Sequence, residues 1–453
     1  MAEKAKFSSR IGLIAATVGS AIGLGNVWRF PAEAQANGGG AFLLVYILCV
    51  FILGIPVMLA EFSLGRGGAT DAVGAYRKYA PKSLWWLAGA LPVLASYIIL
   101  SFYMVVAGWT LEYFVNSVSG ALYSGVPAGD GQLDGFFVGK MQEYVCGTAG
   151  PLLNTYVLII LNLAVLLVGV RKGIERLSNV LMPLLFVVLL VFCCVSLSLP
   201  GAADGLRYFL SPDFSKLSPA VVVNALGQAF FSLSLGMGIL VTYAAYYPKE
   251  TPLSRTAVTV SLLDMMAAVL MGVIIFPAVM SFGLQNADME GTALVFVTLP
   301  EVFAQMAATR IWSSLFFFLL LVAALTSTVS IAEVSVSFVQ NRFRRGRRAA
   351  CLIVLLPLFV LSAASALSFG VLDGIRIGGL CIFDFLDTVA TNVMLPLASI
   401  FLCVFMGWRK PGLLRGELAN YDPEGHRLAG VVVFVVRWVA PLLILAVLVA
   451  NSL

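Results

Sequence analysis

The stretch Val18 to Phe30, VGSAIGLGNVWRF, has the residue types needed to bind a small cation inside a membrane. It lies in an apolar segment that carries no charge from Ile11 to Trp28, yet its three glycines weaken its tendency to form helix. In hydrocarbon every backbone N–H and C=O needs a partner, so an interrupted helix is tolerated only where protein buries it or where it lines a polar cavity. Freed carbonyls and the amide oxygen of Asn26 are ligands that a hard cation such as sodium prefers. The break therefore predicts a binding site.

A second interruption supports this interpretation. Ser232, Ser234, Gly236 and Gly238 gather in another apolar segment, AFFSLSLGMGILVTYAAYY. Two broken segments in corresponding halves of a chain are typical of a transporter with its site near the middle of the membrane. By themselves, the glycines of the first break would be read as a small-residue packing motif between helices. The matching second break, with Asn26 and the costly intramembrane Arg29, favours a site instead.

Composition places these segments in a polytopic membrane protein. The chain is 60% hydrophobic and 11% charged, with a mean hydropathy of +0.98, whereas soluble domains are about 25% charged. Eleven apolar runs are long enough to span a bilayer. They are Ile11 to Ala36, Phe42 to Gly65, Ser83 to Phe114, Pro151 to Val170, Leu177 to Leu199, Pro219 to Tyr247, Thr256 to Phe282, Trp312 to Val339, Ala349 to Phe369, Gly378 to Met406 and Leu428 to Ala450.

The fold predicted is a single all-α transmembrane domain over residues 1–453, with eleven helices. The broken runs are the first and the sixth, which suggests two inverted repeats of five helices at about 11–199 and 218–407 and one additional helix at about 428–450. The halves share no evident sequence identity, so the repeat rests on the matched breaks. The segment VFVTLPEVFAQM is too short to span and is expected to be re-entrant or to lie on the surface.

Lysine and arginine predict the orientation. They precede the first run and then concentrate in alternate loops, most densely at residues 342–348, so the N-terminus is expected in the cytoplasm and the C-terminus outside. No cleavable signal is recognisable, and the predicted location is the inner (plasma) membrane. The formal charge of +5 follows from this topology, and no soluble basic domain indicates a nucleic-acid partner. The lipid bilayer is the expected surrounding, and nothing in the sequence indicates an oligomeric state.

Enzyme and channel functions are disfavoured. The single histidine, His426, lies in a predicted loop, and the seven cysteines have neither metal-site nor disulfide spacing. Catalytic acids and nucleophiles are not found together at workable spacing. A channel would need a continuous pore of one chemistry, whereas the polar groups here converge on two breaks.

Six motifs resemble those of the neurotransmitter:sodium symporter family, in particular its bacterial amino-acid transporters typified by the leucine transporter. They are GSAIGLGNVWRFP, NGGGAF, GIERLSNVLMP, GQAFFSLSLGMG, FVTLPEVF and AALTST. The resemblance runs from about Phe7 to the last apolar run and is most specific in the first, fifth, sixth and eighth. It implies a five-plus-five inverted-repeat fold and sodium-driven uptake by alternating access. A binding sensor of the same fold that has lost coupled transport is the alternative.

The resemblance also implies two sodium sites. The first would comprise the carbonyl of Ala21 and the side chains of Asn26, Ser232 and Asp264, completed by the substrate carboxylate. The second would comprise the carbonyls of Gly19, Ile22 and Ala323 and the hydroxyls of Thr326 and Ser327. Outside this motif, the two hydroxyls would be expected to bond back to their own helix.

The implied substrate is a neutral, hydrophobic or aromatic L-amino acid. Relatives that carry monoamines have an aspartate where this chain has Gly23, which leaves room for the substrate's own carboxylate. Tyr103 and the N–H groups near Leu24 and Gly25 would bind that carboxylate, and freed carbonyls would bind the ammonium. The pocket implied by the family consists of Ser20, Leu24, Gly25, Ile99, Tyr103, Phe231, Ser234, Met237, Ser327 and Ile331.

Charged residues at family positions indicate the outer and inner gates. Arg29 and Asp387 resemble the outer gate, above Phe231 and Tyr103. At the inner gate this chain has Lys4 where the family has an arginine and Asn341 where the family has its aspartate partner, so the family's inner salt bridge cannot form. Other hydrogen bonds of Tyr246 and Glu333 are expected to hold that side.

Asp264 occupies a position where the leucine transporter has asparagine. In the leucine transporter a glutamate takes the place of chloride, and this chain has Ala268 at the position of that glutamate. We therefore expect Asp264 to supply the negative charge and transport to be independent of chloride. A protonated buried acid without an ionic role is the alternative.

Overall fold

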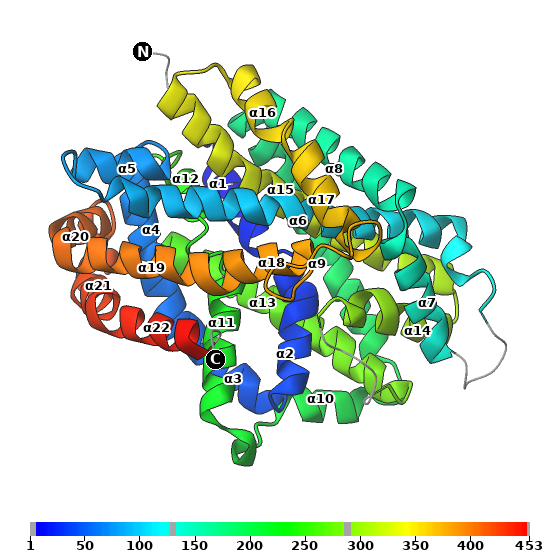
Figure 1. The fold of residues 1–453 in the computed structure, drawn as a ribbon. Helices are drawn as coiled ribbons and strands as arrows, with labels where there is room; N and C mark the ends of the chain where they lie inside the picture. The colour runs from blue at the N-terminus through cyan, green and yellow to red at the C-terminus, as the bar shows by residue number, and fades with distance from the viewer. Residues whose placement is uncertain (1–5, 127–132, 285–290, 451–453) are drawn as a thin grey trace.

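The computed structural model describes residues 6–126, 133–284 and 291–450, and this part of the chain is helical, with two isolated bridges and no strand (Figure 1). Nine continuous helices in these residues are long and apolar enough to cross a membrane. They are Gly40–Gly68, Trp86–Ser119, Ala149–Val168, Val170–Leu197, Leu253–Ser281, Thr309–Phe343, Arg347–Phe369, Ile382–Arg409 and Pro423–Ala450.

The first predicted break is present. Helix α1 (Arg10–Ala21) ends before Ile22, and the chain resumes as η1 (Gly25–Arg29) and α2 (Phe30–Ala36) after a bend of 57°. Ile22 is extended, with ψ 103°, so its carbonyl does not continue the helical ladder. Backbone groups are freed at the residues where the glycines weaken the helix.

The second predicted break lies between α11 (Pro219–Ser232) and α12 (Ile239–Ala244). Three residues in the intervening segment have positive φ: Ser234 at 54°, Gly236 at 77° and Gly238 at 72°. Glycine adopts this region without strain, whereas a serine needs its surroundings to hold it there. The two pieces have 14 and six residues, so neither spans a bilayer alone.

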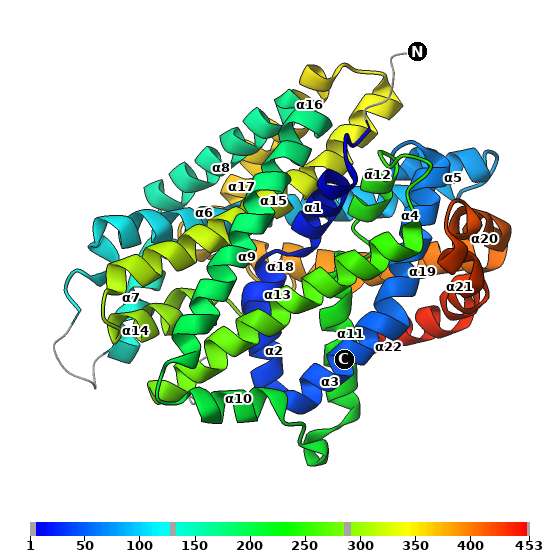
Figure 2. The same cartoon turned by 180° about the vertical axis from the view of Figure 1, so that it is seen from behind.

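Two long helices form the centre of the molecule. Helices α6 (Trp86–Ser119) and α15 (Thr309–Phe343) pack against each other, and 72% and 78% of the residues in their most apolar stretches are buried. The corresponding share is 33% for both α8 (Ala149–Val168) and the peripheral span Pro423–Ala450. In Figures 1 and 2, α1 and the break after α11 lie beside these central helices.

Short helices occupy loops that the sequence did not predict to be helical. Helix α7 (Leu133–Cys146) lies within the glycine-rich stretch between α6 and α8, and α10 (Ala202–Leu210) precedes α11. The segment VFVTLPEVFAQM forms η6 (Leu294–Thr298) and α14 (Leu299–Ala304). The expectation that it could lie on the surface is wrong, because Phe296 is fully buried and packs against four aromatic rings.

The two ends of the molecule carry different short elements. Helix α5 (Ala72–Tyr79) and α20 (Pro411–Ala419) lie at one end, and α7 and α14 lie at the other (Figures 1 and 2). The remaining helices are α3 (Gly40–Cys49), η2 (Val50–Gly54), α4 (Ile55–Gly68), η3 (Ala121–Tyr123), η4 (Val170–Glu175), α9 (Arg176–Leu197), η5 (Phe214–Lys216), α13 (Leu253–Ser281), α16 (Arg347–Leu355), α17 (Leu358–Ala366), η7 (Leu367–Phe369), α18 (Ile382–Asp387), η8 (Thr388–Met394), α19 (Leu395–Val404), η9 (Phe405–Arg409), α21 (Pro423–Phe434), η10 (Val435–Val439) and α22 (Ala440–Ala450).

Candidate functional site

The two breaks are joined by direct hydrogen bonds. The Ser234 hydroxyl donates to the carbonyl of Ser20 at 2.9 Å, and the Gln228 amide donates to the carbonyl of Gly25 at 3.2 Å. Ser20 and Ser234 are both buried. The first bond fixes the strained backbone of Ser234, because it gives the residue's side chain a partner in the opposite break. The freed backbone groups of the two segments therefore face one region.

Asn26, Ser232 and Asp264 form a cluster beside this region. The Asn26 amide nitrogen donates to Asp264 Oδ1 at 2.8 Å and to Ser232 Oγ at 3.0 Å, and the Ser232 hydroxyl donates to Asp264 Oδ2. All three are at most 1% exposed, and Tyr46 Oη lies 3.3 Å from Ser232 Oγ. The Asn26 amide oxygen instead accepts the N–H of Gly23 at 3.4 Å, so a cation in this cluster would need the Asn26 amide to turn its oxygen inward. The carboxylate and hydroxyl oxygens, with one formal charge, fit a small hard cation. The carbonyl of Ala21 at the end of α1 would be the fourth oxygen.

The second predicted cation set lies between α1 and α15. Thr326 donates to the carbonyls of Val322 and Ala323 at 3.1 and 3.0 Å, which is the helix back-bonding expected of a threonine without an ion. Ser327 Oγ is buried without a hydrogen-bond partner among the described residues. Helices α1 and α15 pack together, and the hydroxyl lies beside the first break. An oxygen in that position fits a cation ligand, because a buried hydroxyl without a partner is otherwise costly. At Gly19, whose carbonyl is expected from α1, an added Cβ would lie 3.2 Å from Met182 Sδ of α9.

The first break is closely surrounded where the substrate carboxylate is predicted to bind. Tyr103 Oη accepts the N–H of Leu24 at 3.1 Å. A Cβ added at Gly23 would lie 2.6 Å from Ser327 Oγ and 3.0 Å from Tyr103 Oη, so no side chain fits there without movement. An N–H at the start of a half-helix and a phenolic O–H are suitable donors to a carboxylate.

The rest of the predicted pocket is buried on the surrounding helices. Ser96 of α6 donates to the carbonyl of Met237 in the second break. Ile99 lies one turn further along α6, and Ile331 lies on α15, each 2–3% exposed. These residues come from elements that pack on the breaks.

A large cavity opens above the breaks on the side of α2 and α18. Its volume is about 800 Å³, and its lining includes Tyr103, Phe231, Arg29 and Asp387. The Arg29 guanidinium lies 4.7 Å from the Phe231 ring centre and pairs with Glu33 at 3.7 Å. Arg29 and Asp387 therefore face one cavity but form no ion pair in the described structure. The predicted outer gate is open in this conformation.

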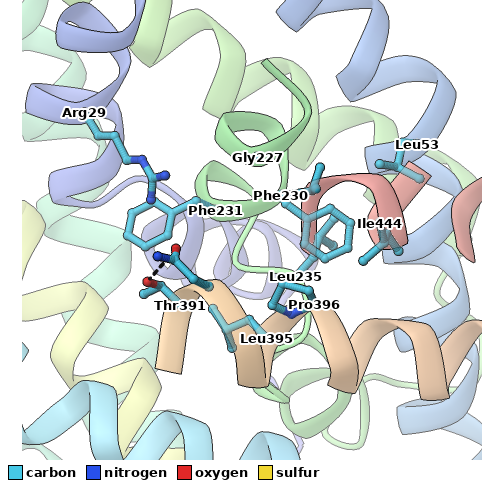
Figure 3. Close-up of a pocket in the computed structure, with 12 residues that line it drawn as sticks. Arg29, Leu53, Gly227, Phe230, Phe231, Leu235, Thr391, Leu395, Pro396 and Ile444 are labelled. Atoms are coloured by element: carbon cyan, nitrogen blue, oxygen red, sulfur yellow. Dashed lines mark hydrogen bonds between the residues drawn. The ribbon is translucent and has the colours of Figure 1, made fainter. Parts of the chain in front are cut away.

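A smaller cavity adjoins this wall. It has a volume of about 40 Å³ and lies between α11, α19 and α22, where Arg29 and Phe231 line it from one side and Ile444 from the other (Figure 3). It has room for at most a few water molecules. It is too small for an amino acid, so the large cavity is the candidate approach to the site.

The opposite end of the breaks is closed. Glu333 of α15 accepts a hydrogen bond from Tyr246 Oη at 2.7 Å and two from Arg347, at 2.7 and 2.6 Å. The Phe7 ring packs on Tyr243, Tyr246 and Tyr247, and its N–H donates to the carbonyl of Tyr246.

The residues of the family's inner gate do not provide this closure in the described structure. Asn341 contacts only Ser337 through its side chain, at 3.4 Å, and Lys4 lies outside the described residues. The predicted hydrogen bond of Tyr246 and Glu333 is formed, and Arg347 is the partner that the sequence did not identify.

Sequence reasoning also missed Glu61. This fully buried carboxylate on α4 accepts the N–H of Gly236 at 2.7 Å, which satisfies a donor freed by the second break. The signal was present, because an acidic residue within a membrane span marks a functional position by default. Glu61 therefore positions the second break from the side of α4.

Comparisons with known proteins agree with this geometry. The sequence model of the Sodium:neurotransmitter symporter family matches residues 4–124 and 140–453. The chain is 37% identical over 443 residues to the uncharacterized sodium-dependent transporter YhdH of Bacillus subtilis, covering 98% of this chain and 96% of that one. It is 36% identical over 420 residues to a sodium-dependent transporter of Methanocaldococcus jannaschii, covering 90% and 82%. The crystal structure of MhsT in complex with L-phenylalanine superposes with a TM-score of 0.88 at 40% identity, covering 99% of this chain and all of that one. This chain therefore belongs to the sodium:neurotransmitter symporter family of membrane transporters.

Proposed function

We propose that this protein is a symporter that imports a neutral, hydrophobic or aromatic L-amino acid together with sodium by alternating access. The observation that carries the proposal is the packing of Gly23 against Ser327 and Tyr103. An amine substrate would need an acidic side chain near its ammonium, and there is no room for one at this position. A substrate with its own carboxylate could accept hydrogen bonds from Tyr103 and the start of η1.

The apolar surroundings favour a hydrophobic side chain. Phe231, Met237 and Ile331 would surround it, and methionine adapts to side chains of different size. The similarity to MhsT, whose crystal structure is a complex with L-phenylalanine, supports an aromatic substrate. Leucine-like substrates remain within the same proposal.

Two sodium ions are proposed as co-substrates. The Asn26, Ser232 and Asp264 cluster would bind the first, beside the substrate carboxylate. The set around Thr326 and Ser327 would bind the second, between α1 and α15. Sodium bound there would link helices that otherwise meet only through packing, so its binding would favour one arrangement of α1.

The open cavity and closed opposite end correspond to an outward-facing state. Phe231 and Arg29 would close over the substrate, and Asp387 would then come within reach of Arg29. On the other side, Glu333 would release Arg347 and Tyr246 when that side opens. The arginine-rich loops lie on the closed side, which the positive-inside rule places in the cytoplasm.

The proposed topology has eleven spans. Nine continuous helices, the bent pair α1 and α2, and the broken pair α11 and α12 give this number. An odd number of spans puts the two termini on opposite sides of the membrane, and the positive-inside rule supports a cytoplasmic N-terminus and an external C-terminus. The proposed location is the plasma membrane. The matched breaks in spans one and six support two inverted five-helix repeats.

Chloride independence is part of the proposal. Asp264 carries a carboxylate at the first sodium site, and Ala268, one turn further on α13, carries none. A second negative charge is therefore not needed to balance the ion.

Competition binding tests the proposal. Each of the twenty amino acids and several biogenic amines would compete with labelled phenylalanine for the purified protein, in sodium and in potassium. We expect hydrophobic or aromatic amino acids to compete and binding to disappear in potassium. Competition by amines, or equal binding in both salts, would contradict the Gly23 argument or the sodium sites.

The remaining candidate is a sensor that binds without transport. Uptake into proteoliposomes under an inward sodium gradient separates the two. Accumulation that a sodium ionophore abolishes is expected of the symporter. Binding without accumulation would leave the sensor.

A further inference from the structure

Many exposed cations lie near the beginning of α16, at the closed end of the molecule where Arg347 binds Glu333. The loop from α15 to α16 has five arginines within residues 342–348, and η4 with the start of α9 adds three more cations. One of the five, Arg347, turns inward to Glu333. The other seven are exposed and are called here the arginine surface: Arg171, Lys172, Arg176, Arg342, Arg344, Arg345 and Arg348.

These cations lie on neighbouring elements. The Arg347 Nε donates to the carbonyl of Leu166 at 2.8 Å, five residues before Arg171. Helix α16 packs on α8, and η4 packs on α8 and α15. In both views α16 lies along α8 (Figures 1 and 2). The arginine surface is therefore one patch rather than two separate loops.

The patch has no acidic partner in the described structure. Glu175 is buried and bound by Ser8 and Ser9, and Glu333 is bound by Arg347. None of the seven cations forms an ion pair or a side-chain hydrogen bond there. At the α20 and α21 side of the same end, by contrast, Arg66 pairs with Glu417 and Arg255 with Glu424. The positive-inside rule accounts for cations on this face. The rule does not explain why seven cations lie together without acidic residues to balance their charge.

Exposed apolar side chains adjoin the cations. Phe343 is 58% exposed between Arg342 and Arg344, and Val168 is 56% exposed at the end of α8. Ile353 of α16, on the same helix as Arg348, is 50% exposed. The patch thus combines guanidinium groups, which bind phosphate with paired N–H donors, with an apolar face that suits acyl chains.

We propose that the arginine surface binds an anionic phospholipid of the cytoplasmic leaflet, with its phosphate among the guanidinium groups and its acyl chains along α8 and α16. Clusters of four to eight cations next to membrane helices attract anionic lipids in this way. The assignment of the leaflet rests on the proposed function and its topology.

Lipid binding would stabilise the closed end. Four unpaired guanidinium groups of one short loop repel each other, and this repulsion opposes the loop geometry that places Arg347 on Glu333. A bound phosphate offsets the repulsion. Anionic lipid would therefore favour the state in which the pair of Arg347 and Glu333 is formed.

The test measures the thermal stability of the full chain in detergent, with phosphatidylglycerol or phosphatidylcholine added. The variant Arg344→Gln/Arg345→Gln/Arg348→Gln removes three cations of the arginine surface. The matched control Arg409→Gln/Arg415→Gln/Arg427→Gln removes three exposed cations at the α20 and α21 side. We expect phosphatidylglycerol to raise the Tm of the wild type and the control by several degrees more than phosphatidylcholine does. Most of that difference is expected to be lost in the first variant, and to shrink in 0.5 M salt because of screening.

Three outcomes would overturn the proposal. The two lipids could act equally on the wild type, the first variant could keep the full difference, or inorganic phosphate alone could reproduce it, which would indicate a soluble anion. If the triple variant does not insert, Arg345→Gln is compared with Arg409→Gln, and only the former should weaken the lipid effect. The readout needs neither sodium nor amino acid, so its failure is distinguishable from failure of the proposed transport function.

Discussion

The Arg347 guanidinium, at the first residue of α16, binds the Glu333 carboxylate of α15 through two hydrogen bonds. The Glu333 side chain is fully buried and that of Arg347 is 19% exposed. Tyr246, two residues after the end of α12, shares the same carboxylate, so the pair joins the segment that follows the second break to α15 and α16. It occupies the end where the family's inner salt bridge is interrupted by Asn341.

Arg347→Gln is expected to destabilise the protein strongly. It leaves the Glu333 carboxylate buried without its counter-charge, which costs about 3–5 kcal/mol. Thermal unfolding in detergent should show a lower Tm, with Arg348→Gln, an exposed neighbour, as the control. The double variant Arg347→Met/Glu333→Met removes both charges and should recover part of the loss. Equal Tm values for Arg347→Gln and Arg348→Gln would show that the pair does not hold this end.

Gly23→Ala is expected to weaken amino-acid binding. The added Cβ would approach Ser327 Oγ to 2.6 Å, and overpacking of this kind costs about 1–3 kcal/mol, or roughly 5- to 150-fold in affinity. Equilibrium binding of labelled phenylalanine in sodium measures the effect. Gly430→Ala, where an added Cβ meets nothing within 4 Å, is the control. Unchanged affinity for Gly23→Ala would place the substrate elsewhere.

Ser327→Ala is expected to raise the sodium concentration needed for binding. Within residues 6–126, 133–284 and 291–450 the hydroxyl forms no hydrogen bond, and losing a ligand to a charged group costs about 1.5–3 kcal/mol, or roughly 10- to 150-fold. Sodium titration of phenylalanine binding measures this. Thr328→Ala is the control, because Thr328 is equally buried and bonds back to Leu325. A similar sodium requirement in both variants would remove Ser327 from the sodium site.

Asp264→Asn is expected to make transport depend on chloride. The wild type should keep its uptake rate when gluconate replaces chloride at constant sodium. The variant has lost the carboxylate beside the first sodium site, so its uptake should fall in gluconate and recover in chloride. Asp204→Asn on the exposed helix α10 is the control. Wild-type uptake that collapses in gluconate would refute the role assigned to Asp264.

The sequence could predict both breaks, because glycine and serine within apolar runs free backbone groups that need partners. It also predicted the residues of the Asn26, Ser232 and Asp264 cluster, which lie within 3.0 Å of each other. Asn26 and Ser232 flank the two breaks, whereas Asp264 lies on the continuous helix α13 and was assigned to the cluster by the family resemblance. Helix α7 was not predicted, because Gly135 and Gly139 lower its helix propensity, whereas burial of Phe137 stabilises it.

Arg347 could not be singled out from sequence. Five arginines lie within seven positions, and the one that turns inward is distinguished only by its tertiary contacts with Glu333 and the carbonyl of Leu166. The partner of Arg29 could not be predicted from the sequence either. Its observed partner, Glu33, lies one helical turn away, whereas the predicted partner Asp387 would meet it only after closure.

The size of the open cavity connects transport to hydration. A volume of about 800 Å³ holds roughly 25 water molecules at the density of the liquid. In the proposed mechanism a hydrophobic amino acid would displace only a fraction of them, and closure over the substrate would return further water to the surrounding solution. The proposed balance between the open and closed forms would therefore depend on the osmotic pressure of the medium.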